Sequence, residues 1–237
     1  MPVFVKLIVW IGTLLIIAGA AVGSEKQWVL IKEEHGVLLQ SRKLAGYAES
    51  EFRGTRIIDQ PIEVVGAVLA DIPSYTGWFY NCIRAYRVPD NSATDLSFSV
   101  YIGIDVPWPF WNRDVVYAVT TTVEPASGKI RVQGHARSDT AVPYREDHVR
   151  IIDSTLEWTI EPRGSNQSRV TFTKRLNAGG NLGVYLSDAG CQKSVFYSLV
   201  NISEMAADPK YAEIGAKLRR KYGGYGGGDS SILNQKD

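Results

Sequence analysis

Hydrophobic and polar residues alternate along most of this chain, and a period of two is the pattern of a half-buried β-strand. In the clearest run, Leu96 to Val106, every second residue from Leu96 to Ile104 is large and apolar. Strand-like runs cover residues 28–34, 37–42, 47–59, 83–88, 96–106, 115–123, 129–137, 148–161 and 168–176. Because turn residues such as Ser127-Gly128 separate many of these runs, the pattern predicts a mostly antiparallel sheet joined by short turns.

The spacing of apolar residues changes to a helical period in two places. After Pro61, a residue suited to a first helical turn, the apolar spacing predicts a short helix to about Asp71. From Leu182 to Ala206 a broad apolar stripe recurs every 3.6 residues, which predicts an amphipathic helix of roughly 37 Å. Asn181 or Ser187 is expected to cap the start of this second helix, and Pro209 follows its end.

Three parts of the chain differ in composition. Residues 1–23 have one charge, Lys6, before a long apolar run that ends in Ala21-Val22-Gly23, and this is typical of a cleaved secretory signal peptide. The alternative is an uncleaved membrane anchor. Residues 24–207 form the predicted domain, and residues 208–237 are expected to be a polar helix followed by a flexible Gly-rich tail. We therefore expect an exported protein.

Composition narrows the classes of function. The 237 residues suit one sizeable domain, and six Trp and twelve Tyr fit a large apolar interior or an aromatic-lined cavity. A net charge of +1 gives no support for a nucleic-acid partner, and we expect a monomer. The three histidines have no partners at metal-ligand spacing, so neither a metal nor another cofactor is expected. No nucleophile motif such as G-x-S-x-G occurs, so an enzyme is not expected.

The two cysteines bear on the compartment. Cys82 and Cys191 could pair in an oxidising environment, although Cys191 also falls on the apolar stripe of the long predicted helix, where a buried free thiol is equally natural. Together with the signal-like segment, this scarcity of cysteine indicates a bacterial periplasm.

One segment, Pro107 to Asp114, differs from an ordinary turn. Its two prolines exclude a central strand, so it must connect two strands, yet it contains Trp108, Phe110 and Trp111. The pair Arg113-Asp114 ends the segment where the next strand begins. Adjacent residues of a strand point to opposite faces of the sheet, so at most one of these two charges is expected to face the interior.

The order of the predicted elements, together with Pro107-Trp108-Pro109 shortly before Arg113-Asp114, resembles the START (StAR-related lipid-transfer) domain family, in which phosphatidylcholine transfer protein carries a similar stretch. Further matches are Pro61 at a helix start, Val149-Arg150 at the start of a strand, and the turn Gly179-Gly180-Asn181 before the long helix. The resemblance extends from about Trp28 to Ala207.

This resemblance implies an α+β helix-grip fold, in which a curved antiparallel sheet wraps around a long C-terminal α-helix and encloses a hydrophobic tunnel. It also implies a lipid or other hydrophobic small molecule as the partner, with transient contact with a membrane. The implied function is to bind a hydrophobic ligand and carry or transfer it. Two alternatives stay open: a cyclase-like or aromatase-like enzyme on the same fold, with Arg113, Asp114 or His135 as its ionisable group, and a ligand sensor that transfers nothing.

The candidate ligand-binding residues fall into three groups. In the first, Arg113, Asp114 and Arg150 would meet the polar group of the ligand; the alternatives are a structural ion pair and a solvated sheet face. In the second, Trp108, with Phe110 and Trp111, forms a gate loop over the tunnel mouth or touches a membrane, with core packing as the alternative. The third group comprises candidate cavity walls on the strands and on the long helix: Tyr101, Tyr117, Trp158, Phe196, Leu199 and Val200. Parity leaves the facing of the three strand residues open, and core contact is the alternative for the three helix residues.

Overall fold

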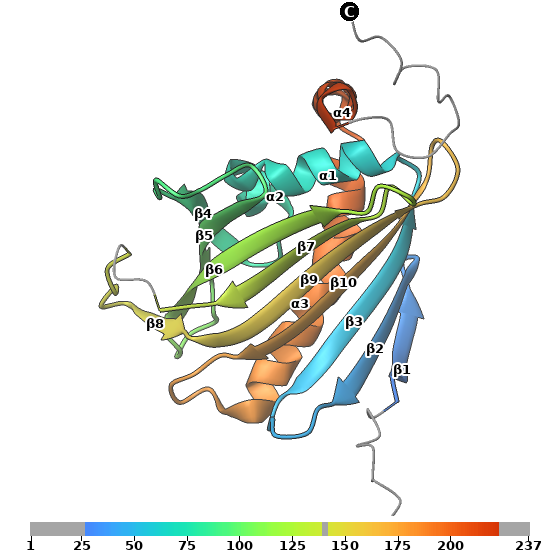
Figure 1. Ribbon diagram of the computed structural model, residues 1–237. Helices are drawn as coiled ribbons and strands as arrows, with labels where there is room; N and C mark the ends of the chain where they lie inside the picture. The colour runs from blue at the N-terminus through green and yellow to red at the C-terminus, as the bar shows by residue number, and fades with distance from the viewer. Residues whose placement is uncertain (1–26, 139–141, 223–237) are drawn as a thin grey trace, which may run out of the picture.

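The computed structural model describes residues 27–138 and 142–222 (Figure 1). The predicted signal peptide, residues 1–23, and the predicted Gly-rich tail after residue 222 lie outside these ranges. Within the described part of the chain, no helix is both long enough and apolar enough to cross a membrane.

The predicted antiparallel sheet is present and curves around one long helix, which confirms the helix-grip fold (Figure 1). Its ten strands follow the order β1-β2-β3-β10-β9-β7-β6-β5-β4, with β8 paired to β6 beside that path. The strands are β1 Val29–Glu34, β2 Val37–Lys43, β3 Ser50–Ile58, β4 Cys82–Val88, β5 Ser97–Ile104, β6 Asn112–Val123, β7 Ile130–Ala136, β8 His148–Ile151, β9 Asp153–Pro162 and β10 Ser168–Asn177.

The pairing of β8 differs from the rest of the sheet. The sequence run 148–161 divides after Ile151 into β8 and β9, and β8 lies parallel to the first residues of β6. This register puts Arg150 directly opposite Asp114 and Val149 opposite Arg113. Two segments about 36 positions apart along the chain therefore meet where the Pro-rich loop enters β6.

The long helix, α3 Gly183–Met205, lies along the concave face of the sheet (Figure 1). Neither predicted capping residue caps it: its N-cap is Leu182, with no side-chain cap bond. Ser187 instead ties the helix to β10, because its hydroxyl donates to Leu176 O (2.8 Å) and accepts from Ala178 N (3.0 Å). Pro209 begins the next helix, and α3 itself ends at Met205.

The other helices gather at one end of the sheet (Figure 1). They are α1 Ile62–Ala70, the 3-10 turn η1 Ile72–Ser74, α2 Tyr75–Trp78 and α4 Pro209–Tyr222. Helix α4 packs on α1 so closely that a Cβ at Gly215 would lie 3.0 Å from Val64 N. Two contacts fix α4: Arg219 donates to both carboxylate oxygens of Glu63, and the Tyr211 hydroxyl donates to Asp71.

Helix α3 approaches β3 at a glycine. A Cβ at Gly54 would lie 2.4 Å from Leu199 Cδ1 and 3.0 Å from Val195 Cγ1, distances that real Cβ atoms rarely or never show. Both Leu199 and Val195 are fully buried. The absence of a side chain at position 54 therefore lets the helix pack directly on this half of the sheet.

Replacing Gly54 with Ala should destabilise the protein. The added methyl overlaps Leu199, and overpacking of this kind costs about 1–3 kcal/mol. Urea unfolding followed by circular dichroism measures the change. The control is Gly190→Ala, on α3 itself, where a Cβ has no neighbour within 4 Å; there the gain in helix propensity should stabilise the protein by up to about 1 kcal/mol. If the two variants had equal stability, close packing at Gly54 would not hold α3 in place.

Candidate functional site

Two cavities lie beneath the concave face of the sheet. Inward-facing residues alternate with outward-facing ones along each strand, and the inward set on β5 and β6 includes Val100, Ile102, Tyr117 and Val119. Here the larger space is termed the α1 cavity and has a volume of about 420 Å³. Most of its lining is apolar and comes from α1, α2 and strands β5, β6, β7 and β9, with Leu218 and Arg219 of α4 at its edge.

The smaller space, termed the loop cavity, has a volume of about 280 Å³ and lies under the Pro-rich loop. Its walls come from residues 104–110, from β10 and from the first turns of α3. Two cationic side chains with little exposure, Arg113 and Lys174, line it, and a third cation, Lys193, is exposed. One acidic residue, the exposed Asp105, also lines the cavity, so it is the buried part of the lining that combines an apolar surface with positive charge.

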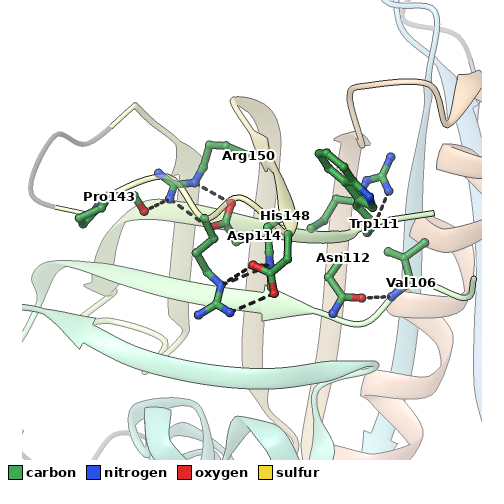
Figure 2. Close-up of polar contacts among 10 residues, drawn as sticks. Val106, Trp111, Asn112, Asp114, Pro143, His148 and Arg150 are labelled. Carbon is green, nitrogen blue, oxygen red and sulfur yellow. Dashed lines mark hydrogen bonds and ion pairs between the residues drawn. The ribbon is translucent and has the colours of Figure 1, made fainter. Parts of the chain in front are cut away.

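The Pro-rich loop is closed by short-range contacts. Asn112 Oδ1 accepts a hydrogen bond from Val106 N at 3.0 Å, which ties the two ends of the loop together (Figure 2). The Trp108–Pro109 peptide bond is cis. Trp108 is 91% exposed and Trp111 63% exposed, so core packing is the wrong interpretation for both. Because Trp108 also lines the loop cavity, it stands at the opening of that cavity.

Arg113 and Asp114 point to opposite faces, as the alternation along a strand predicts. Arg113 faces inward and is 1% exposed. Its guanidinium donates to three backbone carbonyls: those of Ala178 and Gly179, both at 3.2 Å, and that of Trp111. Arg113 therefore links the Pro-rich loop to the turn before α3. Burial lowers the pKa of this guanidinium.

Asp114 lies on the outer face, where it forms a buried ion pair with Arg150 (Figure 2). Both guanidinium contacts are short, with Nε 2.7 Å from Oδ1 and Nη2 3.0 Å from Oδ2. Arg150 also donates to the carbonyls of Val142 and Pro143, and its bond to Asp114 raises its pKa. Asp114 and Arg150 thus form a structural ion pair and line neither cavity, and Arg150 is buried and not on a solvated sheet face.

Tyr101 is also on the outer face. It is 3% exposed, packs in a separate cluster with Val88, Val116 and Val142, and stacks on Tyr86 with ring centroids 4.8 Å apart. Its neighbours Val100 and Ile102 line the α1 cavity instead. Contrary to the expectation, Tyr101 is therefore not a cavity wall. Adjacent strand residues face opposite sides of the sheet, so an error of one residue reverses the assignment.

Tyr117 and Trp158 do line the α1 cavity. The Tyr117 hydroxyl lies 2.8 Å from Ser154 Oγ, which itself donates to Arg175 O, so this hydroxyl already has a protein partner. Burial raises the pKa of Tyr117, and the hydroxyl stays protonated. Trp158 stacks on Phe172 with ring centroids 3.9 Å apart. These two residues give the cavity an aromatic wall.

The three helix residues do not line either cavity. Leu199 packs on β3 at Gly54, and Val200 is a partly buried member of the same core. Phe196 is buried near β1, with Lys32 Nζ 3.5 Å from its ring centroid. The side of α3 that carries these residues is packed core, and it is the first turns of the helix, through Leu182, Leu186 and Ser194, that reach the loop cavity.

Sequence reasoning missed Lys174, in the middle of β10. It is 2% exposed and lines the loop cavity. Its ammonium donates to Ser194 Oγ at 3.1 Å and lies 5.2 Å from the Phe79 ring centroid. Burial lowers the pKa of this amine. The signal was present in the sequence, because Lys174 shares its parity with Phe172 and Leu176, two apolar residues that face inward.

Phe79 stands at the boundary between the two cavities. Its ring lines the α1 cavity, while the Lys174 ammonium beside it lines the loop cavity. Phe79 is buried and packs against Trp78, Tyr75 and Phe172. Phe79 therefore lies where the two cavities come near each other.

Several known proteins share this architecture. No model of a known protein family matches the sequence. An uncharacterised protein of Pseudomonas aeruginosa is 27% identical over 174 residues, which are 73% of this chain and 82% of that protein. A crystal structure of a STAR-related lipid transfer protein fragment from Xanthomonas axonopodis is 27% identical and has a TM-score of 0.68, covering 76% of this chain and 98% of that one. The chain is a START domain.

Two human proteins show the same fold at lower identity. STARD10 has a TM-score of 0.69 at 19% identity, covering 82% of this chain and 76% of that one. StAR-related lipid transfer protein 5 has a TM-score of 0.66 at 17% identity, covering 78% of this chain and 88% of that one. The fold that the sequence resemblance implies is therefore confirmed.

Of the three ionisable residues that the enzyme alternative named, only Arg113 lines one of the two cavities. His135 is exposed on β7, and Asp114 is held by Arg150 on the outer face, whereas Arg113 faces inward. Cys82 and Cys191 are both free and buried. Over residues 27–138 and 142–222, no group of three or more His, Cys, Asp or Glu side chains is placed to hold a metal ion.

Replacing Asp114 with Asn should destabilise the START domain without changing its affinity for a ligand. Breaking a buried ion pair leaves the Arg150 guanidinium without its counter-charge, which costs about 3–5 kcal/mol. Urea unfolding gives the change in stability. Asp147→Asn, which removes the carboxylate of the exposed pair with Arg145, is the matched control and should have little effect. A large loss of ligand affinity in a folded Asp114→Asn variant would instead show that the ion pair contributes to ligand binding.

Proposed function

We propose that this START domain binds one hydrophobic small molecule, a lipid in the first instance, in the space formed by the loop cavity and the α1 cavity. The observation that carries the proposal is the presence of two largely apolar cavities beneath the sheet, where Phe79 of one lies beside Lys174 of the other. Cavities of this size and lining suit an apolar ligand, which gains roughly 25 cal/mol for each Å² of apolar surface removed from water. Two of the similar solved structures are of lipid transfer proteins, which supports the proposal.

The route of entry that we propose is the opening of the loop cavity. Trp108 and Leu186 line that cavity and are exposed, and Trp111 and Tyr185, close to them in the sequence, are exposed as well. Trp and Tyr side chains favour the boundary between water and lipid. A ligand carrier would use this surface for transient contact with a membrane, and the Pro-rich loop would move to admit the ligand.

The proposal also includes the cellular compartment in which the protein acts. A carrier of this kind would act after export, in a bacterial periplasm, with residues 1–23 removed as a signal peptide or retained as an anchor. In that setting the exposed tryptophans would reach lipids of the surrounding membranes, and a bound ligand would cross the aqueous space inside the sheet.

Native mass spectrometry of the purified protein, with extraction and identification of any bound lipid, tests this function. We expect one co-purifying hydrophobic molecule per chain. Val119→Trp, which fills the α1 cavity from β6, should reduce the occupied fraction several-fold. Thr120→Trp is the matched control, because Thr120 is exposed on the opposite face of the same strand and should leave occupancy unchanged. Circular dichroism verifies that both variants fold. A reproducibly empty wild-type protein that also binds no added lipid would contradict the proposal.

A further inference from the structure

The loop cavity contains two buried cations that lack an acidic partner. No carboxylate in the described part of the chain forms an ion pair with Lys174 or with Arg113. An ammonium has three N–H donors, and Lys174 uses one of them, on Ser194 Oγ. A guanidinium has five donors, and Arg113 uses three, all on backbone carbonyls. Neither side chain has its charge neutralised.

The remaining ionisable groups near Lys174 are the thiols of Cys82 and Cys191. Burial raises the pKa of Cys82 to about 11 and that of Cys191 to about 12. Both thiols are therefore protonated and neutral at pH 7. They supply no negative charge that would balance the ammonium.

The two other buried arginines of the described residues, and the half-buried Arg42, do have carboxylate partners. Arg150 pairs with Asp114, Arg175 with Asp153, and Arg42 with Glu51. Arg175 follows Lys174 directly and points to the other face of the sheet, where it forms an ion pair with Asp153. Among the fully buried cations of the described residues, a missing counter-charge is thus confined to the loop cavity. Because an unpaired buried ion costs several kcal/mol, a fold that keeps such a cation in an apolar cavity gains from a bound anion there.

We propose that the loop cavity binds the anionic head of an amphiphile, a carboxylate or a phosphate, with the Lys174 ammonium as its principal counter-charge. The inference rests on the proposed function and names the class of its ligand. The two unused N–H donors of Lys174 bind oxygens of the head, and Arg113 adds positive charge from β6. The apolar chain of the ligand passes Phe79 and extends into the α1 cavity.

Displacement of a neutral apolar dye, Nile red, from the delipidated full chain tests the proposal with four competitors. Dodecanoate and dodecyl phosphate carry an anionic head, dodecanol has the same chain without the charge, and inorganic phosphate has the charge without the chain. We expect both anionic amphiphiles to compete at least about tenfold more strongly than dodecanol, and inorganic phosphate to compete weakly. A tenfold difference corresponds to about 1.4 kcal/mol.

Lys174→Met separates the role of the charge from that of the cavity. This variant should lose about tenfold or more in affinity for dodecanoate and dodecyl phosphate, while dodecanol binds as in the wild type. Its midpoint of thermal unfolding should equal or exceed that of the wild type, because a desolvated charge has been replaced by an apolar side chain. Lys193→Met, which removes the exposed cation of the same cavity, is the matched control. It should change neither the affinity for the anionic amphiphiles nor the midpoint of thermal unfolding. If Lys174→Met does not fold, Lys174→Gln serves for the same comparison.

Equal competition by dodecanoate and dodecanol in the wild type would overturn the proposal. An equal loss of affinity for dodecanoate and for dodecanol in Lys174→Met would overturn it as well. Competition by inorganic phosphate as strong as that of dodecyl phosphate would also overturn it, because the chain would then contribute nothing. In all these cases the proposed binding of a hydrophobic ligand would stand if dodecanol still displaces the dye. Failure of every amphiphile to displace the dye would contradict the proposed function itself.

Discussion

The close contact between α3 and β3 at Gly54 determines which half of the sheet packs directly on the helix and which half borders a cavity. With no side chain at position 54, Leu199 and Val195 reach the backbone of the strand, and α3 packs on β2, β3 and β10. The other half of the sheet curves away from α3. Helix α1 and its partner α4 cover that half, and the α1 cavity remains between them and strands β5, β6, β7 and β9.

The charges of the molecule are divided between the two faces of the sheet. On the outer face, Asp114 and Arg150 neutralise each other in a buried bidentate pair. On the inner face, Arg113 and Lys174 are held by neutral oxygens alone. Because Arg113 and Asp114 are neighbours in one strand, the alternation of β6 places one charge in each environment. An apolar cavity with a positive end is the result.

Local patterns in the sequence predicted the strands, the long helix and the opposite directions of Arg113 and Asp114. They could not predict which parity faces inward, because a half-buried strand presents the same alternation from either face. Tyr101 was placed on the wrong side for this reason. The stripe on α3 was recognised correctly, but only the approach at Gly54 shows that Leu199 meets packed core.

Two features of the site depend on contacts between distant segments. The pairing of Arg150 with Asp114 needs the parallel register of β8 and β6, which neither strand indicates alone. Lys174 was missed because a lysine in a strand is usually assigned to a solvated face. Lys174 shares its parity with Phe172 and Leu176, which are apolar and buried, and this pattern indicates a buried lysine.

A crystal structure of the complex with dodecanoate tests the central claim most directly, since it locates both ends of the ligand at once. We predict a carboxylate oxygen about 2.7–2.9 Å from Lys174 Nζ, a rotated Phe79 ring, and an alkyl chain in the α1 cavity. A carboxylate at the surface beside Lys193, or a chain bound outside the two cavities, would contradict the account.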